Sequence, residues 1–130
     1  MQEKQNVQIV KDMYAAFNRG DIPFILGQLS PNVKWMSHLD PVIPWSGDRA
    51  GRVPDFFKDI NDSVEVQGFE PDEYVAEGNT VVSTGTFACA AKTSGRAAST
   101  KWTFIWKFTD GKVTSYEQFS DPELATIFRN

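Results

Sequence analysis

Cysteine and histidine are almost absent from this sequence. Cys89 is the only cysteine and His38 the only histidine among the 130 residues. A lone cysteine cannot form an intramolecular disulfide, and an unpaired thiol fits a reducing compartment, so we expect a cytoplasmic protein. No His, Cys, Asp and Glu residues have the spacing typical of a zinc site or a facial triad. We therefore expect no metal and no other cofactor.

Long apolar runs and an excess of basic residues are missing as well. The N-terminal stretch MQEKQNVQIVKDMY lacks the apolar core of a signal peptide, and no segment approaches the roughly 20 apolar residues of a membrane span. The formal net charge is −4, whereas nucleic acid and anionic lipid are bound by basic patches. We expect neither nucleic acid nor a membrane as a partner.

Aromatic residues are plentiful. The chain has ten Phe, four Trp and three Tyr, more large rings than a core of this size requires, so some of them are expected to line a cavity. The overall composition, 41% hydrophobic and 23% charged, is that of an ordinary globular protein. Its length and the lack of repeats or linkers indicate a single domain, residues 1–130.

Apolar residues at helical spacing predict three helices in the first half of the chain. The first covers residues 7–18 and ends at Gly20. The second begins after Asp21 as a cap, continues to Leu29, and is ended by residues 30–32. The third carries apolar side chains at i, i+3, i+4 and i+7 from Val53 to Ile60.

Alternating apolar residues predict strands. A short strand over 33–38 would place Val33, Trp35 and Ser37 on one face. After residue 61 the period of two continues almost to the end, which is typical of consecutive antiparallel hairpins. We expect a bulge at Gly68, turns at 77–79, 93–95 and 110–111, and strands over about 80–91, 98–108 and 113–119. A closing helix begins at Asp121 as its cap, followed by Pro122.

This order of elements predicts an α+β fold. A long, strongly curved, mixed or antiparallel sheet would wrap around the three N-terminal helices as a cone, with a short C-terminal helix. The concave side of such a sheet can enclose a ligand.

Four stretches carry a family resemblance: VKDMYAAFNRGD, PWSGDRAGRVPDFF, YVAEGNTVVSTGTF and KWTFIWKFTDGKVTSYEQFSDPELA. With the order of elements, they resemble the SnoaL-like branch of the nuclear transport factor two fold superfamily, which includes ketosteroid isomerase. The resemblance covers nearly the whole chain. It implies the cone-shaped fold but no single reaction, because this superfamily holds isomerases, cyclases, dehydratases, epoxide hydrolases and proteins without catalysis.

The residues that catalyse steroid isomerisation are not matched. The resemblance places Ser37 where the isomerase has its aspartate base, and a hydroxyl cannot replace a carboxylate without an activating partner. It places Met13 and Phe104 where the isomerase has a tyrosine and a protonated aspartate. Tyr14 is one residue away, which turns a helical side chain by about 100°. Steroid isomerase chemistry is therefore not expected.

In SnoaL-like cyclases a general acid or base lies near the final strand, and the local candidates are Glu117 and Asp121. Asp121 is more simply explained as a helix cap. If Trp102 and its alternate neighbours face the cavity, as the resemblance implies, Glu117 lies outside it, although a register slip by one residue would reverse this.

Rings at alternate strand positions share one face and predict a ligand pocket. Buried indoles need hydrogen-bond partners, which Ser37, Gln118 or a ligand can supply. The residues expected to contact a bound substrate are Tyr14, Phe17, Trp35, Ser37, Trp45, Trp102, Phe104, Trp106, Tyr116 and Gln118.

His38 and Asp40 are the candidate catalytic pair. They lie two residues apart where the strand opens into a loop, and at a pocket mouth they could abstract a proton or orient water. The alternative is a solvated strand end whose side chains point away from the cavity. Arg49 and Arg52 fit surface charges better than a gate for an anion, and Cys89 fits a small buried hydrophobe.

Two functions remain open at this stage. One is an enzyme that performs isomerase, cyclase or hydrolase chemistry on a small apolar, cyclic or aromatic molecule by acid and base catalysis. The other is a non-catalytic ligand-binding or dimerisation module with the same pocket. The resemblance also implies a homodimer, because Val82, Thr84, Thr103 and Ile105 would lie exposed on the outer face of the sheet in a monomer.

Overall fold

The computed structural model describes residues 2–129. The helices are α1 (Gln2–Asn18), α2 (Ile22–Gly27), α3 (Val53–Ser63) and the 3₁₀ helix η1 (Pro122–Phe128). The strands are β1 (Leu29–Ser37), β2 (Gly47–Asp48), β3 (Val64–Glu77), β4 (Thr80–Ala91), β5 (Ala97–Thr109) and β6 (Lys112–Ser120). Within this range, no helix is both long and apolar enough to cross a membrane.

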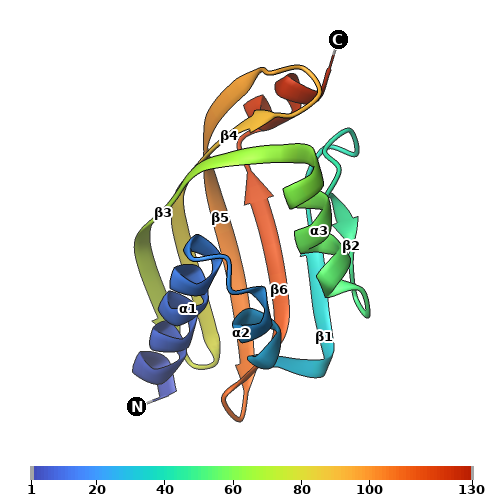
Figure 1. The fold of residues 1–130 in the computed structure, drawn as a ribbon. Helices are drawn as coiled ribbons and strands as arrows, with labels where there is room; N and C mark the ends of the chain where they lie inside the picture. The colour runs from blue at the N-terminus through green and yellow to red at the C-terminus, as the bar shows by residue number, and fades with distance from the viewer. Residues whose placement is uncertain (1, 130) are drawn as a thin grey trace.

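One mixed sheet organises the chain. Its six strands lie in the order β2-β1-β6-β5-β4-β3, so it is open at both edges. β1 and β6 are parallel, and the other neighbours are antiparallel. The expected α+β fold with a strongly curved mixed sheet is confirmed (Figure 1).

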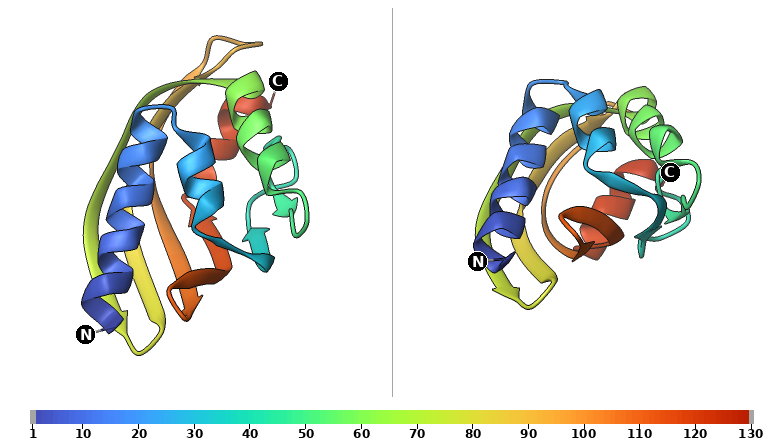
Figure 2. Two further views of the ribbon diagram at one scale, coloured as in Figure 1. Left: turned by 60° about the horizontal axis from the view of Figure 1, so that its bottom comes forward. Right: turned by 90° about the horizontal axis from the view of Figure 1, so that it is seen from below.

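The helices cover only one face of the sheet. Figure 1 shows α1 lying over β3 and β4, α2 in front of β6, and α3 beside β1. Seen from below in Figure 2, the sheet curls around these helices. η1 contacts β4 and β5 beyond the last strand, and its Leu124 is 1% exposed. The described residues leave the convex face of the sheet without a helix.

Alternation along β4 and β5, and along β6 from Tyr116 to Gln118, produces the concave face. Buried and half-buried residues alternate along all of β4, as a strand with one face on a core requires. The register aligns the inward residues in three cross-strand rows: Val81, Trp106, Tyr116 and Trp35; Ser83, Phe104, Gln118 and Ser37; and Gly85, Trp102 and Ser120. The turns at 77–79, 93–95 and 110–111 and the bulge at Gly68 are confirmed.

The boundary between the second helix and the first strand was predicted wrongly. α2 ends at Gly27, and β1 begins at Leu29 rather than at Val33. Leu29 pairs with Val113, whose N–H donates to the carbonyl of Gln28 at 2.9 Å. Pairing with β6 therefore overrides the helical spacing of Leu29, and Gly27 is a poor helix former where the helix stops. The strand also ends at Ser37 rather than at His38.

Gly85 permits the closest approach on the concave face. A Cβ atom at this position would overlap Cζ2 of Trp102 and the carbonyl oxygen of Glu70, and would lie 2.7 Å from Cε2 of Trp102. The indole of Trp102 therefore lies flat over a glycine, which is its direct partner on β4. A cross-strand glycine is thus required for the ring to occupy this place.

We expect Gly85→Ala to lower the free energy of unfolding by about 1–3 kcal/mol, because the new methyl group must displace Trp102 or the β3 backbone. Urea unfolding followed by circular dichroism measures the change. Gly68→Ala is the matched control, since its Cβ would meet only the Cβ of Ala88 at 3.9 Å. The control should stay within about 0.5 kcal/mol of the parent. Equal stability of the two variants would contradict the steric argument.

Candidate ligand-binding site

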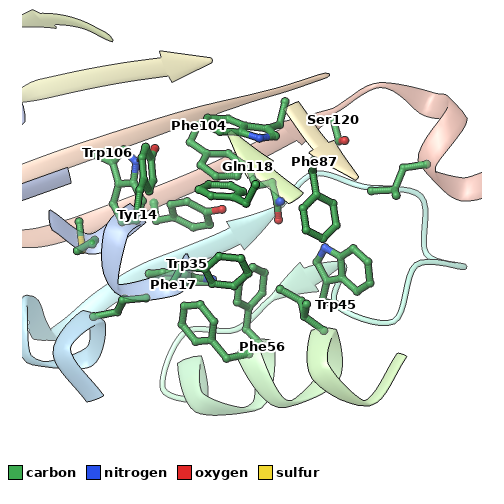
Figure 3. Close-up of a pocket in the computed structure, with 18 residues that line it drawn as sticks. Tyr14, Phe17, Trp35, Trp45, Phe56, Phe87, Phe104, Trp106, Gln118 and Ser120 are labelled. Carbon is green, nitrogen blue, oxygen red and sulfur yellow. The ribbon is translucent and has the colours of Figure 1, made fainter. Parts of the chain in front are cut away.

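A cavity lies between the concave face of the sheet and the helices (Figure 3). It encloses about 60 Å³. All four tryptophans of the chain line it. The other lining residues are Met13, Tyr14, Phe17, Ile25, Phe56, Phe57, Ile60, Phe69, Phe87, Phe104, Tyr116, Gln118, Ser120 and Leu124. Of the residues expected to contact a substrate, only Ser37 is not among the lining residues.

Stacked rings form the wall that β5 contributes. Trp102 stacks on Phe104 with ring centroids 4.0 Å apart, and on Phe69 of β3 at 5.0 Å. On the other side, Trp35 of β1 stacks on Tyr116 of β6 at 4.1 Å. Aromatic pairs in such geometries contribute about 0.5–1.5 kcal/mol beyond their buried area, so these rings hold one another in place.

Tyr14 brings a hydroxyl into this aromatic interior. Its oxygen accepts a hydrogen bond from Nε1 of Trp106 at 2.8 Å and shares a second one with the hydroxyl of Ser83. Met13 and Tyr14 both line the cavity, although they are neighbours in the chain, because α1 presents a wide buried stripe. Burial raises the pKa of Tyr14 above its ordinary value, more than its hydrogen bonds to Ser83 and Trp106 lower it.

Ser37 and Gln118 form the second polar pair. The Ser37 hydroxyl donates to Oε1 of Gln118 at 2.8 Å, and both residues are buried. Their pairing follows from the parallel register of β1 and β6, which makes them direct cross-strand partners. Ser37 therefore holds the amide of Gln118, and the amide reaches the cavity wall (Figure 3).

Two buried indole nitrogens have no acceptor. Nε1 of Trp35 and Nε1 of Trp102 are inaccessible to solvent and make no hydrogen bond within residues 2–129. Of the partners expected from the sequence, namely Ser37, Gln118 or a ligand, the first two bond to each other instead. The indole of Trp106, in contrast, donates to the Tyr14 hydroxyl.

His38 lies outside the cavity. Its Nε2 is 2.9 Å from a carboxylate oxygen of Glu117, and its ring stacks on Phe119 at 4.6 Å. The His38 and Glu117 side chains are 39% and 36% exposed. His38 follows the last residue of β1 and continues its alternation away from the concave face. Glu117 also faces outward, as expected from the register of β6.

Asp40 is held on the surface as well. Its carboxylate pairs with Arg129 and accepts from the backbone N–H of Val42 at 2.9 Å. The hydrogen bond from Val42, followed by the charge of Arg129, lowers the pKa of Asp40. Neither His38 nor Asp40 is among the residues that line the cavity, so the structure does not bring the candidate catalytic pair to a substrate.

Other charged candidates have structural roles. Arg49 is 7% exposed, donates to Asp59 at 2.7 Å and to the carbonyl of Pro44 at 2.8 Å, and so ties the loop before α3 to that helix. The interpretation of Arg49 as a surface charge is therefore wrong, whereas Arg52 is exposed. Asp121 caps η1 by accepting from the N–H of Glu123 at 3.1 Å, as expected.

The cavity is electrically neutral. Among the described residues 2–129, none of those lining it is Asp, Glu, His, Lys, Arg or Cys. Burial raises the pKa of Tyr116 well above its ordinary value, so it stays protonated at neutral pH, as does Tyr14. Cys89 is buried, and burial raises the pKa of its thiol to about 11. No group of three or more possible metal ligands occurs in this part of the chain.

Tyr116 should make stability depend on alkaline pH. Below about pH 10 tyrosine is protonated in both the folded and the unfolded chain, so its contribution is constant. Above that pH the unfolded chain releases the proton and the folded chain keeps it, so the free energy of unfolding falls. At pH 11 we expect Tyr116 to account for about 1.4 kcal/mol of this loss. Urea unfolding of Tyr116→Phe and of the parent between pH 8 and 11 isolates this contribution. If the free energy of unfolding fell equally with pH in both proteins, the prediction would be contradicted.

The fold recurs in solved structures. An NTF2-like protein of unknown function from Burkholderia pseudomallei is 27% identical, with 97% of this chain and 98% of that chain covered and a TM-score of 0.86. An NTF2-like protein from Burkholderia xenovorans is 27% identical, with 98% of each chain covered and a TM-score of 0.85. TerC, co-crystallised with polyporic acid, is 22% identical, with 97% and 99% covered and a TM-score of 0.82.

Among curated proteins, none matches the chain. The family model described as SnoaL-like domain matches residues 10–116, which include α2, α3 and β1 to β5. This match covers most of the chain and agrees with the NTF2-like fold of the solved neighbours. The chain therefore belongs to the SnoaL-like domain family.

Proposed function

We propose that this protein binds a small, uncharged aromatic molecule in the cavity of Figure 3 and does so as a binding module. The observation that carries the proposal is a wall of aromatic rings without an ionised side chain. Such a wall offers dispersion contacts and ring stacking to a flat apolar ligand. A charged ligand would lose its hydration without gaining a partner of opposite charge.

The geometry favours binding over acid and base catalysis. A general base must come within about 2.6–3.2 Å of the proton that it removes, or reach it through one water. His38 and Asp40 are paired with Glu117 and Arg129 on the outside. The tyrosines inside are kept protonated by burial, so they are poor bases. The catalytic alternative therefore lacks a base next to the bound molecule.

The size of the cavity supports a small ligand. One water needs roughly 10–15 Å³ on this measure of volume, so 60 Å³ holds only a few waters. A dry cavity of about 150 Å³ holds benzene, so the entry of even one aromatic ring requires the lining side chains to move outward. TerC, a neighbour in fold, has been co-crystallised with polyporic acid, so a protein of this fold is compatible with a small-molecule ligand.

We expect the protein to bind 2-phenylpropene and not benzoate, because the two are flat single-ring molecules that differ in charge. The indole N–H signals of the four tryptophans, observed by ¹H–¹⁵N NMR, report on the cavity directly, since all four residues line it. His38→Ala is the control and should bind 2-phenylpropene as the parent does. No shift with 2-phenylpropene, or equal shifts with benzoate, would contradict the proposal.

We also propose that the convex face joins two copies in a homodimer. No helix among residues 2–129 covers this face, and the half-buried side chains of Val82, Thr84, Thr103 and Ile105 point from it. Thr103 lies between Thr84 and Phe119 in one cross-strand row, and Phe119 is 40% exposed. A second copy would remove this surface from water.

Light scattering at micromolar concentration should therefore show a dimer. Thr103→Glu should convert it to a monomer, because it places a charge at the centre of the proposed interface. The matched control, Val42→Glu, adds the same charge at an exposed loop position outside the sheet and should remain dimeric. A monomeric parent protein would contradict the proposal.

A further inference from the structure

The two ends of the Gln118 amide have different surroundings. A primary amide offers acceptor lone pairs on its oxygen and two N–H donors on its nitrogen. Oε1 accepts from the Ser37 hydroxyl at 2.8 Å. For Nε2, no hydrogen bond is found within residues 2–129, although the residue is only 8% exposed. Since Gln118 lines the cavity, its donor end is available to a bound molecule.

Two tryptophans also have N–H donors that lack an acceptor. Nε1 of Trp35 and of Trp102 are further buried donors without an acceptor among the described residues. The Tyr14 oxygen is already engaged by Trp106 and Ser83. The hydroxyls of Tyr116 and Ser120 can either donate or accept, so they do not change the balance. Unpaired donors on the lining residues therefore outnumber unpaired acceptors. Because the two indole nitrogens are shielded, the amide of Gln118 is the donor offered to a ligand.

The acceptor has to be uncharged. A carboxylate or phosphate in the cavity would be buried beside neutral donors only, without the cationic partner that a buried anion needs. A carbonyl oxygen accepts from an amide N–H without carrying a charge. It also lies in the plane of an attached ring, so the same molecule can stack between the aromatic walls.

From this geometry we propose that Gln118 is the specificity-determining residue of the cavity. Its Nε2 donates to the carbonyl oxygen of a neutral one-ring aromatic ketone or aldehyde. Ser37 is a positioning residue, since its hydrogen bond to Oε1 turns the N–H donors toward the ligand. This proposal rests on the proposed binding function and adds the chemical class of the ligand.

A pair of ligands of equal shape tests it. Acetophenone and 2-phenylpropene have the same skeleton, with C=O in one and C=CH₂ in the other. Dissociation constants for both are measured by titrating the tryptophan indole N–H signals. The carbonyl of acetophenone gains a hydrogen bond from Gln118 but loses one with water, so the net gain is small. We expect acetophenone to bind about five- to tenfold more tightly than 2-phenylpropene.

Variants of Gln118 and Ser37 test whether these residues cause the preference for acetophenone over 2-phenylpropene. Gln118→Met keeps the length of the side chain and removes the donors, so it should equalise the affinities for the two ligands. Ser37→Ala should lower the preference through loss of amide orientation, and Ser37→Thr, which keeps the hydroxyl, should restore it. A purely structural role of Ser37 would weaken both ligands equally. Should Gln118→Met fail to fold, the two Ser37 variants carry the test alone.

The outcomes separate the two proposals. If 2-phenylpropene binds the parent and acetophenone binds no better, the role of Gln118 is wrong while the aromatic binding function stands. An unchanged preference in Gln118→Met, or in Ser37→Ala, overturns the assignment in the same way. Aniline carries N–H donors and toluene does not. A Gln118-dependent preference for aniline over toluene would therefore show that the amide presents its oxygen to the ligand, and would also overturn the assignment. If 2-phenylpropene does not bind the parent protein, the proposed function itself fails.

Discussion

The cavity depends on the alternation of β5, which places Trp102, Phe104 and Trp106 on one side of the sheet. These rings occupy a curved surface, so they converge on the space that α1 and α3 close. Trp102 reaches its place only because its cross-strand partner is Gly85, and Phe104 then stacks on Trp102 at 4.0 Å. A change in this register would move every ring to the convex face.

Polar groups inside this shell are arranged in neutral pairs. The Tyr14 hydroxyl on α1 accepts from the indole of Trp106 on β5. The Ser37 hydroxyl on β1 donates to the amide oxygen of Gln118 on β6. Both pairs depend on the register of the rows, since Ser37 and Gln118 are direct partners on parallel strands. Where a carboxylate would give the cavity a base, Ser37 gives it an oriented amide. The cavity is consequently suited to hydrogen bonding and stacking and lacks a group that exchanges protons near neutral pH.

Much of the fold could be predicted from the sequence, because alternation and turn residues are local signals. The bounds of β4 and the turns were correct, whereas Leu29 belongs to a strand that forms only through pairing with β6. Most of the cavity lining was also predictable from alternate rings. The partners of the polar atoms were not: Tyr14 with Ser83 joins residues far apart in sequence, and buried Arg49 gave no local signal of its pairing with Asp59. The neutrality of the cavity became evident only when His38 and Asp40 were placed outside.

Binding and stability are linked through the unpaired donors. A buried donor without an acceptor costs roughly 1–3 kcal/mol, and the indoles of Trp35 and Trp102 both carry this cost. Under the proposed function, a ligand that binds the folded chain alone would raise the free energy of unfolding by mass action. In that proposal the Gln118 amide, a further donor without an acceptor among the described residues, would select the ligand. An aromatic core with every donor satisfied internally would be more stable, and it would have nothing with which to distinguish one flat molecule from another.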